Sequence, residues 1–163
     1  ALPEYSDYRF VVAAAPARSE ADYAKYIGGR EYVSVVFGQS YAVMRNAKAA
    51  VVNSGTASLE CALIGTPQVV AYKGAEINFL IAKMIIKIQY ISLGNLILDR
   101  ICFRELLQYY FTPDNVLYEV RRMIEDEEYR SAMLSGYQEI RDALGGEGAS
   151  AAVARAMIEE LRK

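Results

Sequence analysis

Residues 51–72 contain the side chains whose types and spacing best suit a chemical role. An apolar run ends at Ser54, Gly55 and Thr56, and a helix-forming segment follows with Glu60 near its start. A helix N-terminus offers unpaired backbone amides and about half a positive charge, so a phosphate can bind there with little help from side chains. Gly55 would allow close approach, and the two hydroxyls would add hydrogen bonds. The pattern therefore predicts an anion site.

Glu60 adds a second function to this predicted site. It follows Thr56 by four residues, which is about 6 Å along a helix axis. This distance matches the separation between the phosphates of a nucleotide and its ribose hydroxyls, which a carboxylate binds in dinucleotide-binding folds. The alternative is that Ser54 only caps the helix while Glu60 complements its dipole. The residues alone leave both interpretations open.

Composition indicates one globular domain and excludes several chemistries. The chain has 163 residues, of which 53% are hydrophobic and 23% charged, and its net charge of -2 gives no overall electrostatic reason to bind nucleic acid. Because the sequence has no histidine, histidine-dependent triads and histidine-containing zinc sites are excluded, and we expect no metal. Cys61 and Cys102 lack CxxC spacing and are interpreted as buried packing residues.

The hydrophobic pattern predicts an α/β fold. Short apolar runs at 8–16, 31–39, 47–55 and 67–73 alternate with helix-forming segments at 19–26, 39–47, 57–64 and 75–87. Strands that are apolar throughout are typical of a parallel sheet with helices on both faces, as in Rossmann-like domains. A short strand is expected at 89–93, and the last third is predicted to be helical at 113–125, 127–144 and 149–162.

Gly38 and Gln39 stand where a predicted strand ends. In open α/β sheets, ligands bind at the carboxyl ends of the strands. This loop could therefore face a bound base, although a plain exit from the strand explains the two residues equally well.

Three segments of the sequence resemble a known family. The segments GQSYAVMRNAKAAVVNSGTASLECALIGTPQVVAYK, LIAKMIIKIQYISLGNLIL and RELLQ are similar, in order and spacing, to the C-terminal half of lipid-A-disaccharide synthase. That family is a GT-B type glycosyltransferase with two Rossmann-like domains. The resemblance extends from Phe37 to Gln108 and is weaker over the terminal helices. It identifies residues 1–163 as a single nucleotide-sugar-binding domain.

The resemblance implies an activity. The family transfers 2,3-diacylglucosamine from its UDP donor to 2,3-diacylglucosamine 1-phosphate, which is lipid X, and releases UDP. It uses no cofactor, and it works in the cytoplasm, peripheral to the cytoplasmic face of the inner membrane. Rival interpretations are another UDP-sugar enzyme, such as the peptidoglycan N-acetylglucosaminyltransferase or the UDP-N-acetylglucosamine 2-epimerase, and a non-catalytic α/β binding module.

The resemblance also assigns ligand contacts to individual residues. Its Ser-Gly-Thr and following Glu fall on the predicted anion site, which would hold the diphosphate and the ribose. Its Asn falls on Asn95 and its Arg on Arg100, as contacts to sugar or phosphate, while Glu105 and Gln108 would line the same cleft. Without the resemblance, Asn95 is better explained as a turn residue and Arg100 as half of a surface ion pair.

The beginning of the sequence resembles the end of a helix followed directly by a strand. We therefore expect a fragment that lacks the first β-α unit and the N-terminal acceptor domain, where the catalytic carboxylate would lie, and that is inactive alone. The missing strand is central in such sheets. The strands at 10–14 and 50–53 would then either close on each other or recruit a second copy, and we expect a homodimer.

A membrane-spanning segment is not predicted, because no window approaches the roughly 20 apolar residues that a span needs. The start also lacks the features of a secretory signal, so the sequence predicts a soluble, cytosolic protein. Lys83 and Lys87 lie on one face of an apolar predicted helix. This helix could rest on a lipid surface or be buried against another domain.

Overall fold

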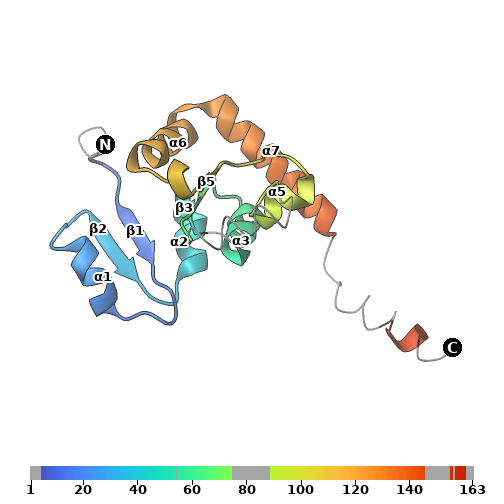
Figure 1. Ribbon diagram of the computed structural model, residues 1–163, viewed down its shortest axis with the longest axis horizontal. Coiled ribbons are helices and arrows are strands. Elements are labelled where there is room, and N and C mark those ends of the chain that lie inside the picture. Colours follow the sequence, from blue (N-terminus) through green and yellow to red (C-terminus); the bar gives the residue numbers. More distant parts are fainter. Residues whose placement is uncertain (1–4, 54, 75–88, 146–154, 156, 161–163) are drawn as a thin grey trace.

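The computed structural model describes residues 5–53, 55–74, 89–145, 155 and 157–160 (Figure 1). The helix expected at 75–87, with Lys83 and Lys87, lies outside the described residues. Of the helix expected at 149–162, only residue 155 and residues 157–160 are described, and they are helical.

Strands and helices alternate through the first half of the chain, as predicted. In chain order the elements are β1 (Phe10–Ala13), α1 (Glu20–Ile27), β2 (Val33–Val36), α2 (Ser40–Asn46), β3 (Ala50–Val52), α3 (Thr56–Ile64), β4 (Gln68–Tyr72), α5 (Leu93–Leu98), β5 (Glu105–Leu107), the 3-10 turn η1 (Gln108–Tyr110), α6 (Pro113–Glu125) and α7 (Glu127–Leu144). The bounds of α6 and α7 agree with the prediction to the residue, because each helix has a strong start signal. Thr112 caps α6 ahead of a proline, and Asp126 caps α7.

All pairs among the described strands are parallel, which confirms the predicted α/β class. The described strands form two sheets, one with the order β1-β2 and the other with the order β3-β4-β5. Val51 lies opposite Val69, and Ala71 lies opposite Leu106. Because the strands are parallel, their carboxyl ends meet at one edge of each sheet.

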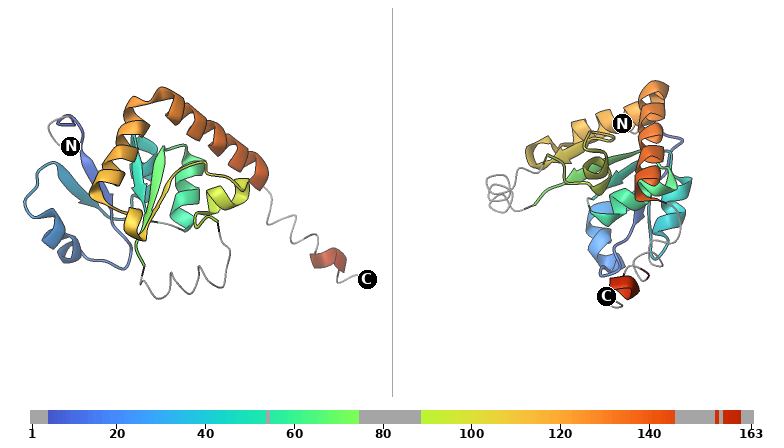
Figure 2. Two further views of the ribbon diagram at one scale, coloured as in Figure 1. Left: turned by 45° about the horizontal axis from the view of Figure 1, so that its top comes forward. Right: turned by 90° about the vertical axis from the view of Figure 1, so that its right-hand side faces the viewer.

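The core surrounds β4. The first four residues of this strand, Gln68–Ala71, are all buried, as expected for a central parallel strand covered on both faces. Helices α3 and α6 contact β4, and α7 packs across α3 and α5 (Figure 2). The side chains of the core cluster include Ala62, Val69, Val70, Phe103, Met123, Met133, Tyr137 and Ile140.

Strands β1 and β3 each have one edge that pairs with no other described strand. Among the described strands, β1 pairs only with β2, and β3 pairs only with β4. Apolar side chains on these edges remain accessible, with exposed fractions of 41% for Phe10, 42% for Val11 and 50% for Val51. Direct closure of the two edges on each other, one of the outcomes considered from the sequence, does not occur in the described part of the chain.

The prediction of a strand at 89–93 is wrong. Residues 89–92 form bends or irregular structure, and α5 begins at Leu93. The reason is a contact distant in sequence: the backbone amides of Ile91 and Ser92 donate to the Glu105 carboxylate at 2.9 and 3.0 Å. A carboxylate that accepts these amides stabilises a helix start, as a capping residue would. Sequence reasoning also missed β5, a three-residue strand.

No helix among the described residues is both long enough and apolar enough to cross a bilayer.

Close packing of α7 against the loop after α5 gives a first prediction. Gly136 lies within α7, and a Cβ at this position would collide with Sγ of the buried Cys102. We predict that Gly136→Ala lowers the free energy of unfolding by about 1–3 kcal/mol, although alanine is the better helix former. Urea denaturation measures this change.

The double variant Gly136→Ala/Cys102→Ala provides the matched control. Removing the sulfur makes room for the added methyl group, so the double variant should be more stable than the sum of the two single changes predicts. Strictly additive effects would contradict the close approach of Gly136 and Cys102.

Candidate functional site

Helix α3 begins without a side-chain cap. Its N-cap is Gly55, no side chain among the described residues caps the first amides, and the first turn carries no acidic residue. By contrast, Thr112 and Asp126 cap α6 and α7 with side-chain oxygens. The Ser58 amide donates to the Gly55 carbonyl at 3.2 Å, and this leaves the amides of Thr56 and Ala57 as the donors directed out of the helix.

The backbone at Gly55 keeps this helix end open. Gly55 has φ 78° and ψ -148°, a conformation that is accessible essentially only to glycine. Apart from the two neighbouring residues in the chain, no described atom would lie within 4 Å of a Cβ built at Gly55, so the space beside this residue is open. Ser54, the predicted hydroxyl donor, lies outside the described residues.

Glu60 lies one turn into α3, and a side chain of the neighbouring helix α2 donates a hydrogen bond to it. The Tyr41 hydroxyl on α2 donates to Glu60 Oε1 at 2.9 Å. Helices α2 and α3 pack against each other, so this hydrogen bond joins two adjacent helices. Tyr41 is the functional candidate that sequence reasoning missed, although its place in the first turn of a helix after a strand was a usable signal.

Gly38 and Gln39 lead into α2. Gly38 has φ 67°, Gln39 is the N-cap of α2, and both residues are exposed. They follow β2 as Gly55 follows β3, so each loop leaves the carboxyl end of a strand in its own parallel sheet. We call the group formed by the two loops and helix starts the carboxyl-edge site, and its residues are Gly38, Gln39, Tyr41, Gly55, Thr56 and Glu60.

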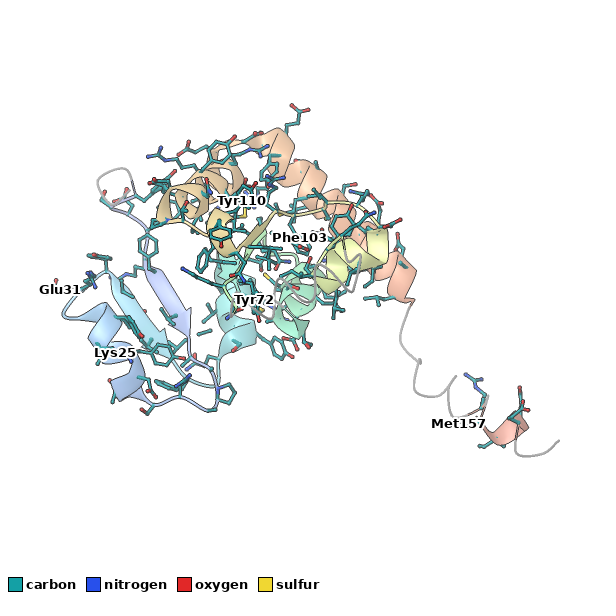
Figure 3. All side chains as sticks on the ribbon, viewed as in Figure 1. Lys25, Glu31, Tyr72, Phe103, Tyr110 and Met157 are labelled. Carbon is teal, nitrogen blue, oxygen red and sulfur yellow. The ribbon has the colours of Figure 1, made fainter. Side chains whose placement is uncertain are left out.

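Gln108 also follows a strand at a carboxyl end. It is buried, has φ 49°, and its Nε2 donates to the Gly74 carbonyl at 3.2 Å. This bond ties η1, which ends at Tyr110, to the segment that follows Tyr72 at the end of β4 (Figure 3). The structure therefore places Gln108 beside the chain that leaves β4, and its contact with a ligand stays a prediction.

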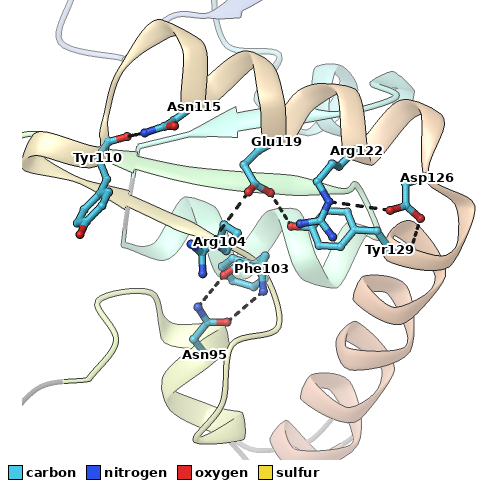
Figure 4. A network of polar contacts seen from close by, with 9 residues as sticks. All are labelled: Asn95, Phe103, Arg104, Tyr110, Asn115, Glu119, Arg122, Asp126 and Tyr129. Carbon is cyan, nitrogen blue, oxygen red and sulfur yellow. Dashed lines mark hydrogen bonds and ion pairs between the residues drawn. The ribbon is translucent and has the colours of Figure 1, made fainter.

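Asn95, by contrast, is fully buried and fully bonded. Its Nδ2 donates to the Phe103 carbonyl and to Glu105 Oε1, both at 2.9 Å. Its Oδ1 accepts from the amides of Cys102 and Phe103 at 2.8 and 3.3 Å, and Figure 4 draws the bonds between Asn95 and Phe103. An asparagine amide has two donors and two acceptor sites. Asn95 therefore has no polar capacity left for a sugar or phosphate in this structure.

Glu105 has a similar internal role. Besides Asn95, its carboxylate accepts from the amides of Ile91 and Ser92 and from the Ser92 hydroxyl. These contacts join the start of β5 to the start of α5. The structure thus gives Glu105 a structural role, and lining of a ligand cleft is not needed to explain it.

Arg100 is directed toward α7. Its Nη2 lies 2.5 Å from Glu139 Oε1, and both side chains are about half exposed. This is the surface ion pair that was the alternative explanation from sequence. The structure brings Arg100 to Glu139 and not to the carboxyl-edge site, so a contact of Arg100 with a ligand stays a prediction.

A second polar network joins α6 to α7. Buried Glu119 accepts from the Tyr129 hydroxyl at 2.7 Å and lies 3.9 Å from Arg104, while Arg122 stacks on the Tyr129 ring (Figure 4). Burial, followed by the bond to Glu119, raises the pKa of Tyr129. These groups satisfy one another, which indicates a role in stability.

The cysteines do not supply a nucleophile. Burial raises the pKa of the Cys61 thiol to about 12 and that of Cys102 to about 11, so both remain protonated at neutral pH. In the described part of the chain, no group of three or more acidic or cysteine side chains could hold a metal ion.

Comparison with known proteins identifies the family. The family described as Lipid-A-disaccharide synthetase matches residues 3–157. The chain belongs to this family. Curated proteins named lipid-A-disaccharide synthase are similar to it over most of its length. The protein from Trichlorobacter lovleyi is 33% identical over 156 residues, covering 93% of this chain and 41% of the relative.

Similarity to two further relatives supports the assignment of this chain to the lipid-A-disaccharide synthetase family. The synthase from Anaeromyxobacter dehalogenans is 33% identical to this chain, and the matched region covers 97% of this chain and 42% of the relative. The synthase from Myxococcus xanthus is 38% identical over 127 residues, or 78% of this chain and 33% of the relative. The chain thus spans about two fifths of the length of the first two of these relatives.

Among solved structures, the glycosyltransferase SnogD from Streptomyces nogalater is similar at 18% identity, with a TM-score of 0.42, covering 82% of this chain and 38% of that chain. This likeness is too weak to support an inference.

The internal bonds of Asn95 give a second prediction for this member of the lipid-A-disaccharide synthetase family. Asn95→Ala leaves the Cys102 and Phe103 backbone groups unsatisfied in the core, so we expect a loss of about 2–4 kcal/mol in the free energy of unfolding. Urea denaturation measures the loss. A variant with unchanged stability but weaker binding of UDP would show instead that Asn95 contacts the ligand.

Proposed function

We propose that this chain binds the UDP-sugar donor of a glycosyltransferase of lipid A biosynthesis. The whole enzyme would transfer 2,3-diacylglucosamine from UDP to 2,3-diacylglucosamine 1-phosphate and release UDP. The single observation that carries the proposal is the open start of α3, with Glu60 one turn further on. Membership of the lipid-A-disaccharide synthetase family supports it.

The diphosphate would bind at the amides of Thr56 and Ala57, with the Thr56 hydroxyl as a further donor. These donors and the helix dipole are directed at the position where negative charge grows as UDP leaves. Because the amides are fixed by α3 before the ligand arrives, they need no reorganisation during the reaction. Ser54 would add a hydroxyl to the same phosphates.

The nucleoside would lie between α3 and the loop before α2. Glu60 would accept the ribose hydroxyls in charge-assisted hydrogen bonds. Gly38 and Gln39 would border the base, since both are exposed at the start of α2, which packs against α3. Each of these contacts uses a group at the carboxyl-edge site.

The acceptor chemistry would need more than this chain. Because the chain spans about two fifths of its relatives' length, we assign to it donor binding and not the complete transfer. The N-terminal acceptor domain of the same enzyme would be its partner. The acylated substrates place the proposed enzyme at the cytoplasmic face of the inner membrane, as a peripheral protein.

A third prediction tests donor binding. A ligand at 100 times its Kd stabilises the folded state by about 2.7 kcal/mol, so UDP should raise the melting temperature of the chain, and ADP should raise it less. Glu60→Gln keeps the side-chain volume but removes charge-assisted bonds that contribute about 1.5–3 kcal/mol. We therefore expect about a 10- to 100-fold loss of UDP affinity by calorimetric titration.

Glu31→Gln is the matched control, because Glu31 is an exposed glutamate just before β2. It should leave UDP affinity unchanged. Equal stabilisation by UDP and ADP would indicate a general anion site, and an unchanged affinity in Glu60→Gln would remove Glu60 from the ribose site.

We also propose that the accessible edges of β1 and β3 pair with those of a second copy, which would make the chain a homodimer. The unpaired parallel edges and the exposed Val11 and Val51 support this, since an open strand edge is a template for pairing between chains.

Our fourth prediction follows from these edges. Sedimentation at micromolar concentration should detect a dimer, and Val11→Lys/Val51→Lys should shift it to monomer because lysine protects strand edges. The control Tyr26→Lys changes an exposed residue on α1 and should leave the dimer intact. A monomeric unmodified chain would contradict the proposal.

A further inference from the structure

One hydrogen bond at the carboxyl-edge site is not explained by the fold alone. The Tyr41 hydroxyl donates to Glu60 Oε1 at 2.9 Å, although Tyr41 is 59% exposed. An exposed tyrosine hydroxyl is well satisfied by water, so burial does not require this partner. The bond nevertheless fixes the one carboxylate that the proposed function uses.

The two side chains come from firmly connected elements. Helix α2 packs against α3, and the Thr66 hydroxyl beyond the end of α3 donates to the Met44 carbonyl in α2 at 2.6 Å. Tyr41 is the second residue of α2, so the two helices are linked near both ends of α2. Tyrosine also has few side-chain torsions to restrict. The hydroxyl is therefore presented to Glu60 from a defined position.

The bond leaves half of the carboxylate available. A carboxylate has two oxygens, and the Tyr41 hydroxyl occupies only Oε1. Among the described residues, the structure shows no second hydrogen bond to Glu60. Oε2 therefore remains available to a ligand, while the bond at Oε1 restricts the orientation of the carboxylate.

We propose that Tyr41 is a positioning residue that orients the Glu60 carboxylate and so sets the preference of the site for a nucleotide with free ribose hydroxyls. The inference rests on the proposed function, in which Glu60 accepts those hydroxyls. Tyr41 does not touch the phosphates and acts only through Glu60.

The physical basis is preorganisation. A free glutamate side chain loses rotamer freedom when a ligand orders it, and this loss weakens binding. A carboxylate that Tyr41 already holds loses less freedom. The advantage applies only to ligands that use the carboxylate, so it increases the affinity for ribose hydroxyls and leaves phosphate binding unchanged.

The protonation state of Tyr41 fits this role. The hydrogen bond to Glu60 and the negative charge of that carboxylate raise the pKa of Tyr41. The phenol therefore stays protonated and remains a donor throughout the neutral range.

The simpler alternative is that the bond only ties α2 to α3. In that case, removing the hydroxyl would change stability but would not change which nucleotide binds. The two explanations thus predict different ratios between the affinity for a nucleotide with ribose hydroxyls and the affinity for one without them. This ratio does not depend on the folded fraction of the sample, because both ligands bind the same folded population.

The experiment compares UDP with 2′,3′-dideoxy-UDP, which lacks both ribose hydroxyls, by calorimetric titration of the chain. The unmodified chain should prefer UDP, and Tyr41→Phe should reduce this preference by about threefold to tenfold, the usual effect of one hydrogen bond. Affinity for the dideoxy ligand should change little. Tyr26→Phe, which removes an exposed hydroxyl on α1, is the matched control and should keep the preference.

The Glu60→Gln background completes the test. If Tyr41 acts through the carboxylate, adding Tyr41→Phe to Glu60→Gln should cause no further loss of preference. An undiminished preference in Tyr41→Phe, or a full additional loss in the double variant, would overturn the inference while the proposed function stands. An unmodified chain that binds both ligands equally, or binds neither, would contradict the proposed function itself and the inference with it.

Discussion

The parallel pairing of β4 with a strand on each side is the constraint on which the rest of the described structure depends. Gln68–Ala71 are buried, with β3 on one side of β4 and β5 on the other, so among the described residues the ladder hydrogen bonds of β4 are made with these two neighbours. Parallel strands all end at the same edge. The loop after β3 must therefore emerge beside the loop after β4, and α3 must start there.

Polar capacity separates the open site from the closed ones. Asn95 and Glu105 resemble ligand-binding residues, yet their donors and acceptors are used to join α5 to β5. At the start of α3 the opposite holds, because Gly55 supplies no side chain and no other described residue caps the first amides with a side chain. A ligand that brings phosphate oxygens would satisfy these amides, which is why the carboxyl-edge site is the better candidate.

Local patterns were enough to predict some elements and not others. The segment 51–72 was predictable because glycine, hydroxyl and proline residues delimit short apolar runs. The strand expected at 89–93 failed because the amides there are held by Glu105, more than ten residues away, and no local pattern encodes that contact. Tyr41 was missed because its role appears only when α2 and α3 are neighbours, and Arg100 pairs with Glu139 on a helix distant in sequence.

The most direct test of the account is a titration of the ¹⁵N-labelled chain with UDP, followed by NMR of the backbone amides. The account predicts that the largest shifts fall on the amides of Gly55, Thr56 and Ala57, with smaller shifts around Tyr41, because the diphosphate accepts hydrogen bonds from the start of α3. The amides around Arg100 and Glu139 should shift little. Shifts concentrated around Arg100, with the α3 amides unchanged, would contradict the central claim that α3 holds the diphosphate.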